Sequence, residues 1–570
     1  MKRIPLLIAL FMITCIARTQ EPGKYKADLD SQFNKGSGIA SIPLDNRRIN
    51  DLVVLGKVWG FVKYYHPAVC AGEYNWDSEL FRVLPKVMQC NNDKERNEIL
   101  YTWVKQLGAF KTEKFKQPDS GLIKLQPDLL WINEVAVLGD PLSALLNDIK
   151  SAKRTTNNYY VRWGRSGSPD FKNERAYADR GYPDAGLRLL ALYRYWNLVQ
   201  YFFPYKYLIG ENWNEMLPAF IPPIVNAPEE LAYKQAVLSL IVRIHDSHAG
   251  MGALVFEKVL GNNYAPLKIR FIDNKPVVTD YLNKDLGPKT GLQKGDVITS
   301  VNGKSIEAII KEKLPYTSGS NYSTQLRNMA YSLLRAVDTV INITYQRGST
   351  MRSASIGCYK PQLVPWGGMK VDSCFKYVTP DIAYLFPDTM RKDYLNGLLP
   401  SLKNTKGMII DMRSYPPNDV REILSTFLLA EQTPFVRFAF PDLEHPGYFI
   451  LAKPREVGSR NPDHYKGRVV ILVSELTQSA GEFTSMAFRA VPQSTVVGST
   501  TAGADGNVTF FFLPGGIRTQ FSGIGVYYPD GRETQRVGIV PDITVQQTIQ
   551  GIAEGRDEVL EKAIAVINGK

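Results

Sequence analysis

Apolar residues recur every three to four positions over about residues 44–108, a period that predicts amphipathic helices. The same pattern, rich in aromatic side chains, returns further along the chain. In one gapless register Trp59 matches Trp196, and Trp76 matches Trp213. Several large residues in one register indicate that a helical unit has been duplicated.

The two helical copies are expected at 44–149 and 185–255, joined by residues 150–184. The joining segment is polar and rich in Gly, Ser, Arg and Asn, which predicts a linker or an irregular surface segment. The second copy ends in Ser247-His248, where the first copy has Phe-Lys in the same register. This difference suggests that only the second copy was put to chemical use.

Strand alternation replaces the helical period over residues 262–350. Its centre has the sequence Gly-Leu-Gln-Lys-Gly-Asp-Val-Ile, followed by an Asn-Gly pair at 302–303 that predicts a hairpin turn. The segment resembles the PDZ pattern of bacterial proteases. Such a module binds an extended peptide, usually a C-terminus, by adding it as a strand. The resemblance implies a peptide site at Gly291 and Leu292; alternatively, the module only packs against its neighbours.

Short buried strands alternate with helices over residues 355–570, which predicts an α/β domain with a largely parallel sheet. The expected strands are 381–386, 407–412, 468–473 and 494–498, with a helix at 418–431. The whole chain is therefore expected to be a multidomain α+β protein.

The sequence Thr-Gln-Ser-Ala-Gly-Glu at 477–482 falls between an expected strand and the helix expected at 483–489. A serine at such a corner has its hydroxyl lifted clear of the sheet, beside helix N–H groups that suit a developing oxyanion. The alternative is a capping box, in which Ser479 caps the helix and Glu482 reaches back.

Composition and charge limit the classes of function that this protein can have. Apolar residues make up 44% and charged residues 22% of the 570 positions, typical of folded protein with several domains. The net charge of +12 is spread along the chain without a run of Lys and Arg, which argues against a nucleic-acid partner. No metal-ligand spacing or cofactor motif is found, so we expect neither a metal nor a cofactor.

The first 20 residues predict a signal peptide. Two basic residues precede an apolar core at 6–17 that is too short to span a bilayer. We therefore expect an exported protein without a transmembrane helix after the signal peptide is removed. Cys15 would be the site if the protein is anchored by a lipid instead.

Four further cysteines fall in two local pairs, Cys70 with Cys90 and Cys358 with Cys374. An even number of cysteines in an exported chain suits two disulfides in an oxidising compartment. The alternative is four separate buried thiols.

Three motifs in the C-terminal half occur in a recognisable order. Ser-Ala-Gly-Glu at 479–482 follows a strand, Gly-x-x-Thr-x-Gly follows at 498–503, and Gly-Ile-x-Pro-Asp-Ile follows at 538–543. Together with the PDZ pattern, they resemble the C-terminal processing (tail-specific) serine peptidase family over about residues 236–545. The resemblance implies a crotonase/ClpP-like catalytic domain, a peptide or protein C-terminus as substrate, and the periplasm or cell envelope of a bacterium.

Two branches of that family differ in their base. One uses a lysine directly after the Thr-x-Gly, where this chain has Ala504. The other is similar to the tricorn core and the interphotoreceptor retinoid-binding protein repeats, and takes its base from a Ser-His pair ahead of the PDZ segment. Ser247-His248 stands in that place, which implies Ser479 as nucleophile and His248 as base. A serine hydroxyl needs such a base within reach, and histidine has a suitable pKa.

The base in turn needs a group that orients it, and Ser247 backed by a carboxylate is a candidate. In the branch that the chain resembles, the carboxylate is a Glu three residues before the Gly-x-x-Pro-Asp motif. This chain has Gln535 there and Glu533 two residues earlier. Either Glu533 or Gln535 is therefore a candidate for this role.

The oxyanion hole is a further departure from the family. The Ala480 amide is one expected donor, but the loop that usually supplies the second contains Pro416 and Pro417, which have no N–H. The second donor then comes from another residue of this loop or is absent, and loss of one donor costs about a hundred- to a thousandfold in rate. The alternative function is a weak or inactive family member that binds a peptide or a small apolar ligand.

Overall fold

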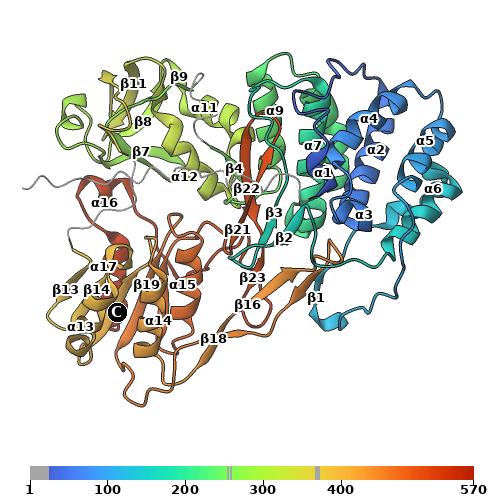
Figure 1. The fold of residues 1–570 in the computed structure, drawn as a ribbon. Helices are drawn as coiled ribbons and strands as arrows, with labels where there is room; N and C mark the ends of the chain where they lie inside the picture. The colour runs from blue at the N-terminus through green and yellow to red at the C-terminus, as the bar shows by residue number, and fades with distance from the viewer. Residues whose placement is uncertain (1–24, 253–255, 257–259, 366–372) are drawn as a thin grey trace, which may run out of the picture.

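The computed structural model describes residues 25–252, 256, 260–365 and 373–570. They form a helical N-terminal region, a sheet-containing middle domain and a C-terminal α/β domain, which meet at strands β4 and β22 (Figure 1). The predicted mixture of helices and sheets in several domains is confirmed. The predicted signal peptide and Cys15 lie outside the described residues. None of the helices in the described ranges is long and apolar enough to cross a membrane.

The N-terminal region is built of helices that begin at polar caps. Asp45 accepts a hydrogen bond from the Arg48 amide at the start of one long helix, and Asp184 accepts one from the Leu187 amide at the start of its counterpart. The helices are α1 (Lys26–Leu29), α2 (Asn46–Tyr65), α3 (Pro67–Cys70), α4 (Trp76–Gln89), α5 (Asp93–Lys105), α6 (Val135–Lys150), α7 (Ala185–Phe202), α8 (Trp213–Val225) and α9 (Glu230–Val242).

The two helical copies share one internal contact. The Trp59 indole donates to the Trp76 carbonyl at 2.9 Å, and the Trp76 indole donates to the Trp59 carbonyl at 2.8 Å. In the second copy, Trp196 donates to the Trp213 carbonyl at 2.8 Å and Trp213 donates to the Trp196 carbonyl at 3.0 Å. Each reciprocal pair satisfies buried polar groups and fixes the first helix of its copy against the second.

The segment between the copies contains the short hairpin β2 (Val161–Trp163) and β3 (Pro169–Phe171). It also buries Glu174, whose carboxylate lies 2.7 Å from Lys63 Nζ of α2 and 2.7 Å from Arg194 Nε of α7. Because both cations are fully buried and come from different copies, this carboxylate links the copies in the core.

The middle domain has an antiparallel sheet in the order β12-β11-β8-β7-β6. Its strands and helices are β6 (Leu267–Ile272), β7 (Lys275–Tyr281), β8 (Val297–Val301), β9 (Lys304–Ser305), β11 (Val340–Arg347), β12 (Thr350–Gly357), α11 (Ile306–Lys313) and α12 (Tyr322–Leu333). The expected Asn-Gly turn joins β8 to β9, with φ of 48° at Asn302 and 78° at Gly303.

Strand β6 is one of the two edge strands of this sheet, and among the described strands it pairs only with β7. Helix α12 packs beside it. Leu292 is instead buried in the core of the domain, and the Gly291 carbonyl accepts a hydrogen bond from Arg347 at 2.8 Å. Leu292 therefore packs in the core while Gly291 is exposed, and the peptide site expected at these two residues stays a prediction.

The C-terminal domain has a six-stranded sheet in the order β13-β14-β15-β19-β20-β24, parallel from β14 onward. Its strands are β13 (Phe375–Thr379), β14 (Ile382–Leu385), β15 (Gly407–Asp411), β19 (Arg468–Val473), β20 (Ser494–Gly498) and β24 (Ile543–Thr544). The four strands and the helix expected from the sequence in this region are confirmed, the helix as α14 (Asn418–Leu428).

Helices cover both faces of this sheet. Helix α13 (Lys392–Leu402), α14 and α15 (Ala480–Arg489) pack on one face, and α17 (Glu558–Ile567) packs on the other. Val469, Ile471 and Val473 of β19 face the first group, whereas Val470 and Leu472 face α17. A strand buried on both sides explains the unbroken apolar run of β19.

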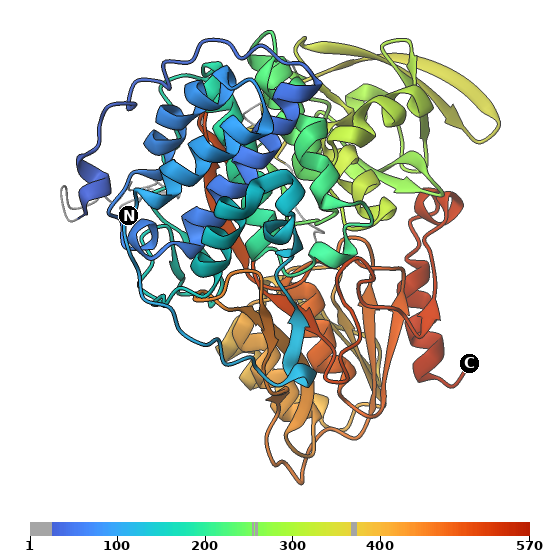
Figure 2. The same ribbon diagram turned by 90° about the vertical axis from the view of Figure 1, so that its right-hand side faces the viewer.

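Two short strands join the helical region to the C-terminal domain (Figures 1 and 2). Strand β1 (Ile123–Leu125) pairs with β17 (Phe449–Leu451), and β4 (Gly250–Met251) pairs with β22 (Ile517–Ser522). The remaining strands of this junction are β16 (Thr433–Pro441), β18 (Arg455–Val457), β21 (Val508–Leu513) and β23 (Gly525–Tyr527). The β4 pairing places the end of the second helical copy beside the C-terminal domain.

All four cysteines of the described ranges are free thiols, so the predicted disulfides are wrong for this structure. Cys70 lies at the end of α3, with its Sγ 3.4 Å from the Tyr64 carbonyl, and Cys90 follows α4, with its Sγ 2.9 Å from the Val87 carbonyl. Cys358 belongs to the core of the middle domain, whereas Cys374 packs against the C-terminal domain. Each thiol is held by its own element, away from its expected partner.

Candidate active site

Ser479 occupies the turn between β19 and α15 with φ of 55° and ψ of −118°. A residue with a side chain rarely adopts a positive φ, and such strain is found at functional sites that are held by their surroundings. The Ser479 amide donates to the Ala504 carbonyl at 3.0 Å and to the Glu482 carboxylate at 3.2 Å. Helix α15 begins at the next residue, so its free amides lie beside the serine.

Glu482 connects the Ser479 turn to the Thr-x-Gly motif. Its buried carboxylate accepts hydrogen bonds from the Thr501 hydroxyl, from the Gly503 amide at 2.8 Å and from the Ala504 amide at 3.1 Å. Burial raises the pKa of Glu482, while these hydrogen bonds lower it. The backward contact expected of a capping box is present, and it holds the strained serine in place.

His248 is oriented by a chain of contacts through β22. Its Nδ1 lies 2.9 Å from the Ser522 hydroxyl oxygen, which in turn lies 3.1 Å from Oδ1 of Asp246. Because an ionised Asp246 can only accept, Ser522 donates to it and accepts from Nδ1–H. This tautomer leaves Nε2 with a free lone pair, as a general base requires.

Two opposing effects set the pKa of His248. Burial lowers it, and the nearby Asp246 carboxylate raises it, with burial the larger effect. The imidazole is therefore neutral at neutral pH. Gln535 is also buried here and donates to Oδ1 of Asp246 at 3.4 Å.

The other predicted members of the site lie elsewhere. The Ser247 hydroxyl donates to the Ala502 carbonyl at 2.8 Å and accepts from the Ser320 amide at 2.8 Å, so it does not face the imidazole. Glu533 accepts from Lys124 at 2.6 Å and from the Tyr207 hydroxyl at 2.7 Å. Of the two candidate orienting residues, the structure brings Gln535 to the site and not Glu533.

Asp246 and Ser522 were missed from the sequence. Asp246 lies two residues before His248, so the His-Asp-Ser-His sequence contained a signal that could have identified it. Ser522 has no such signal, because only the pairing of β4 with β22 brings it to the site. Both orient the His248 imidazole.

Ser479 and His248 come together through their neighbours. Gln478 donates to the Ser247 carbonyl at 3.3 Å across 231 residues of sequence. Within the described ranges, no hydrogen bond joins the Ser479 hydroxyl to the imidazole. Such a bond commonly tightens only when substrate binds.

The loop after β15 packs directly on the start of α15. A Cβ on Gly481 would lie only 3.1 Å from the Ser414 carbonyl oxygen. Tyr415 is the last residue of the loop with an N–H before the two prolines, and it lines the same cavity as Ser479 and Ala480. The buried Arg413 anchors the loop through Asp411 and Asp557.

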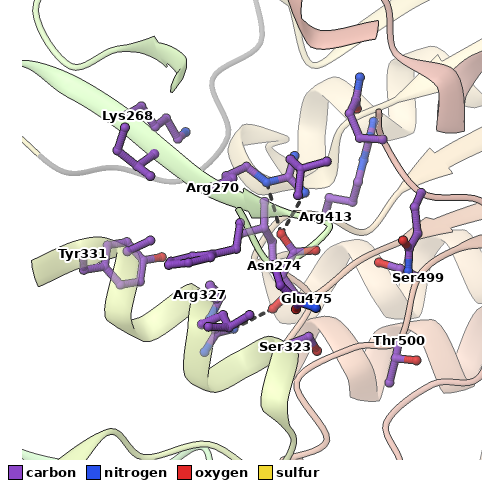
Figure 3. Close-up of a pocket in the computed structure, with 18 of the residues that line it drawn as sticks. Lys268, Arg270, Asn274, Ser323, Arg327, Tyr331, Arg413, Glu475, Ser499 and Thr500 are labelled. Carbon is purple, nitrogen blue, oxygen red and sulfur yellow. Dashed lines mark hydrogen bonds and ion pairs between the residues drawn. The ribbon is translucent and has the colours of Figure 1, made fainter. Parts of the chain in front are cut away.

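A second cavity, of about 540 Å³, lies between β6, α12 and the C-terminal domain (Figure 3). Arg270 of β6 binds the Glu475 carboxylate at 2.7 Å (Figure 3). Arg327 of α12 donates to the Glu475 carbonyl at 2.8 Å and to the Gln478 side chain at 2.6 Å. Because Gln478 immediately precedes Ser479, this cavity is linked to the nucleophile turn.

Comparison with known proteins relates the C-terminal domain to a peptidase family. Residues 381–545 match the model of peptidase family S41. The structure is similar to mature CPAF in complex with lactacystin (14% identity, 68% of this chain and 99% of that chain, TM-score 0.53) and to mature CPAF (15% identity, 68% and 98%, TM-score 0.52). The photosystem II D1 C-terminal processing protease also matches (15% identity, 65% and 98%, TM-score 0.37). No curated protein matches the sequence.

The likeness to the two CPAF structures shows a shared fold. The family match spans β14 to β24 and includes the Ser479 turn. The resemblance predicted from the sequence is confirmed, because the C-terminal α/β domain matches peptidase family S41 over residues 381–545.

Proposed function

We propose that this protein is an exported serine endopeptidase that cleaves peptides or protein tails, with Ser479 as the nucleophile and His248 as the base. One observation carries the proposal. The Asp246–Ser522–His248 chain fixes the imidazole tautomer so that Nε2 is the basic atom, in the same site as a serine in a strained turn.

The proposed reaction follows the acyl-enzyme route. Ser479 Oγ attacks the scissile carbonyl carbon while His248 Nε2 takes the hydroxyl proton. The protonated imidazole then gives that proton to the leaving amine as the C–N bond breaks, which leaves the acyl group on Ser479. Water attacks this ester with His248 again as base, and the serine is regenerated.

The oxyanion would be held by the Ala480 amide at the start of α15. We assign the second donor to the amide of Tyr415, since Pro416 and Pro417 cannot donate. The position of Tyr415 on the cavity that also contains Ser479 supports this assignment.

We propose that the middle domain is PDZ-like and binds a substrate tail along the free edge of β6. An unpaired edge strand beside a helix is the geometry of strand addition. The arginines at this edge contact Glu475 and Gln478, immediately before the nucleophile. A tail bound there would lie close to the Ser479 turn.

Export to a bacterial periplasm or cell envelope is proposed from the N-terminal sequence alone. The basic start and short apolar core at 1–20 support it. Fractionation of the cells that express the full chain tests it directly.

A second candidate is a binding protein with the same fold and a silent site. The missing Ser479–His248 hydrogen bond and the two loop prolines favour it. A fluorophosphonate probe separates the two, because it labels a serine only when its neighbours activate it. Under our proposal, the probe labels the wild-type protein. It also labels the control variant Ser401→Ala, which changes an exposed serine of α13.

Labelling should disappear in Ser479→Ala and in His248→Ala. A folded wild-type protein that stays unlabelled would refute the hydrolase and favour the binding protein.

A further inference from the structure

The cavity at Ser479 combines an apolar wall with charged side chains. It measures about 440 Å³, and Ser479 and Ala480 lie on its wall. Its apolar side is formed by Phe438, Phe483 and Ile524. Its polar side contains two arginines, Arg421 and Arg455, and one buried acid, Asp505.

Arg421 is held in place with one donor still available. Its guanidinium carbon lies 4.8 Å from the centre of the Phe483 ring, and its Nε and Nη2 donate to Glu422 at 3.2 and 2.7 Å. Within the described ranges, no acceptor lies within hydrogen-bond distance of Nη1. The side chain is largely buried, so this charge acts in a medium less polar than water.

Asp505 is only 3% exposed, and one of its oxygens has no partner. Oδ1 accepts from the Gly506 amide at 2.6 Å, whereas Oδ2 is buried without a hydrogen bond in the structure described. Burial and the negative charge of Glu482 raise the pKa of Asp505 well above its usual range. A protonated Asp505 has an O–H to donate, and leaving it unpaired costs free energy.

We propose that this cavity binds a carboxylate of the substrate at the residue next to the scissile bond. Arg421 Nη1 and the Asp505 hydroxyl donate to that carboxylate, and the exposed Arg455 adds positive charge at the entrance. The proposal rests on the proposed peptidase function and specifies which substrates the site prefers.

Competing side chains fit this cavity less well. A lysine or arginine of the substrate would meet two guanidinium groups. A large apolar side chain would suit the aromatic wall but would leave the Asp505 oxygen unpaired. A glutamate places its methylene groups on the aromatic wall and its carboxylate at the donors.

The carboxylate has two sources, an acidic side chain or the C-terminus of a substrate cut close to its end. Acetyl-Ala-Ala-X coumarinylamides, with X as Glu, Gln, Lys or Leu, place X beside the scissile bond and have no free terminal carboxylate. Acetylated Ala-Ala-Ala, with a free or an amidated terminus, tests the other source.

Binding is measured on the Ser479→Ala variant, which requires no turnover. We expect the Glu compound to bind about tenfold more tightly than the Gln compound, or the free-terminus peptide to bind about tenfold more tightly than the amidated one, or both. Hydrogen bonds to a charged group have this strength. Arg421→Met and Asp505→Leu should remove the preference. Asp505→Asn should keep it, since the amide still donates. Glu431→Gln, at an exposed acid that does not line this cavity, is the matched surface control.

Equal binding of Glu and Gln together with equal binding of the two termini would overturn the proposal. Tighter binding of the Lys compound, lost in Asp505→Asn, would also overturn it, because Asp505 would then act as an anion. Arg455→Gln, at an exposed residue, keeps the test valid if a buried variant fails to fold. A preference for carboxylate in a protein that the fluorophosphonate does not label would sustain this inference while the proposed function fails.

Discussion

The two helical copies have the same internal contact but connect to different parts of the molecule. Both close their first helix on their second with a reciprocal pair of tryptophan hydrogen bonds. After α9 the second copy continues into Asp246, His248 and β4, which enter the C-terminal domain. After α5 the first copy continues into a segment that contains β1, which pairs with β17 of that domain.

Packing explains why the second copy, and not the first, lies beside the candidate active site. Every residue of α7 is buried, whereas α2 has partly exposed positions. Helix α7 lies between the first copy and the C-terminal domain, where Arg194 donates to the Phe512 carbonyl at 2.6 Å. The two copies therefore differ in position: the outer copy packs against the inner one, and the inner one contains the proposed base, His248.

The largest expected effect compares the ends of the two copies. Replacement of the proposed general base in His248→Ala should lower kcat/KM by about a hundred- to ten-thousandfold. Lys111→Ala changes the residue in the same register of the first copy, which is exposed, and should leave kcat/KM within about twofold. Steady-state kinetics on one peptide substrate measures both, and equal losses in the two variants would show that the copies do not differ in this way.

A smaller effect concerns Asp246, the carboxylate behind the base. The base works only when neutral, so activity falls as the pH drops through the pKa of His248, which burial places below 6.5. Asp246→Asn removes the charge that raises this pKa, so the acid limb of kcat/KM should move to lower pH. The loss of orientation should also lower the rate by about a hundredfold.

Ser522→Ala is the matched variant for this experiment. It breaks the contact with Nδ1 but keeps the charge of Asp246, so the rate should fall while the acid limb stays near its wild-type position. An acid limb that does not move in Asp246→Asn would argue against this carboxylate as a partner of the base.

The parts of the site that could be predicted are those that depend on local sequence. Ser479 follows an apolar strand and opens a helix, a pattern visible within about twenty residues. The contrast between the copies drew attention to His248, and the family resemblance implied its role as base. Ser522 could not be found, because its role depends on which strand pairs with β4. Glu533 was a candidate because it is a carboxylate, although Gln535 has the expected spacing. Lys124 of the helical region holds Glu533 elsewhere.

The same reasoning accounts for the fold. The helices of both copies and the parallel strands have strong periods, and the structure contains them. The cysteine pairing failed because spacing in sequence says little about which way a thiol points. The peptide site at Gly291 and Leu292 stays a prediction, since the structure shows only that Leu292 packs in the core and that β6 is an edge strand.

The smallest expected effect compares the two tryptophan pairs. Trp76→Phe and Trp213→Phe each remove one buried hydrogen bond from an indole N–H to a helix carbonyl, which should cost about 0.5–1.5 kcal/mol of stability. Calorimetry should show similar decreases in Tm. Activity per folded molecule should fall only in Trp213→Phe, since the second copy positions Asp246 and His248. Loss of activity in Trp76→Phe at an unchanged fold would contradict the division of roles.

The distance along the chain between the two proposed catalytic groups has a consequence for the cell. Gln478 and Ser247, the neighbours of nucleophile and base, are 231 residues apart and meet only through tertiary contacts. The histidine is synthesised long before the serine, and β22, which orients it, is made later still. A chain that is still being synthesised therefore has no assembled site. Under the proposed function, it cannot cleave proteins of the cell that produces it until folding is complete.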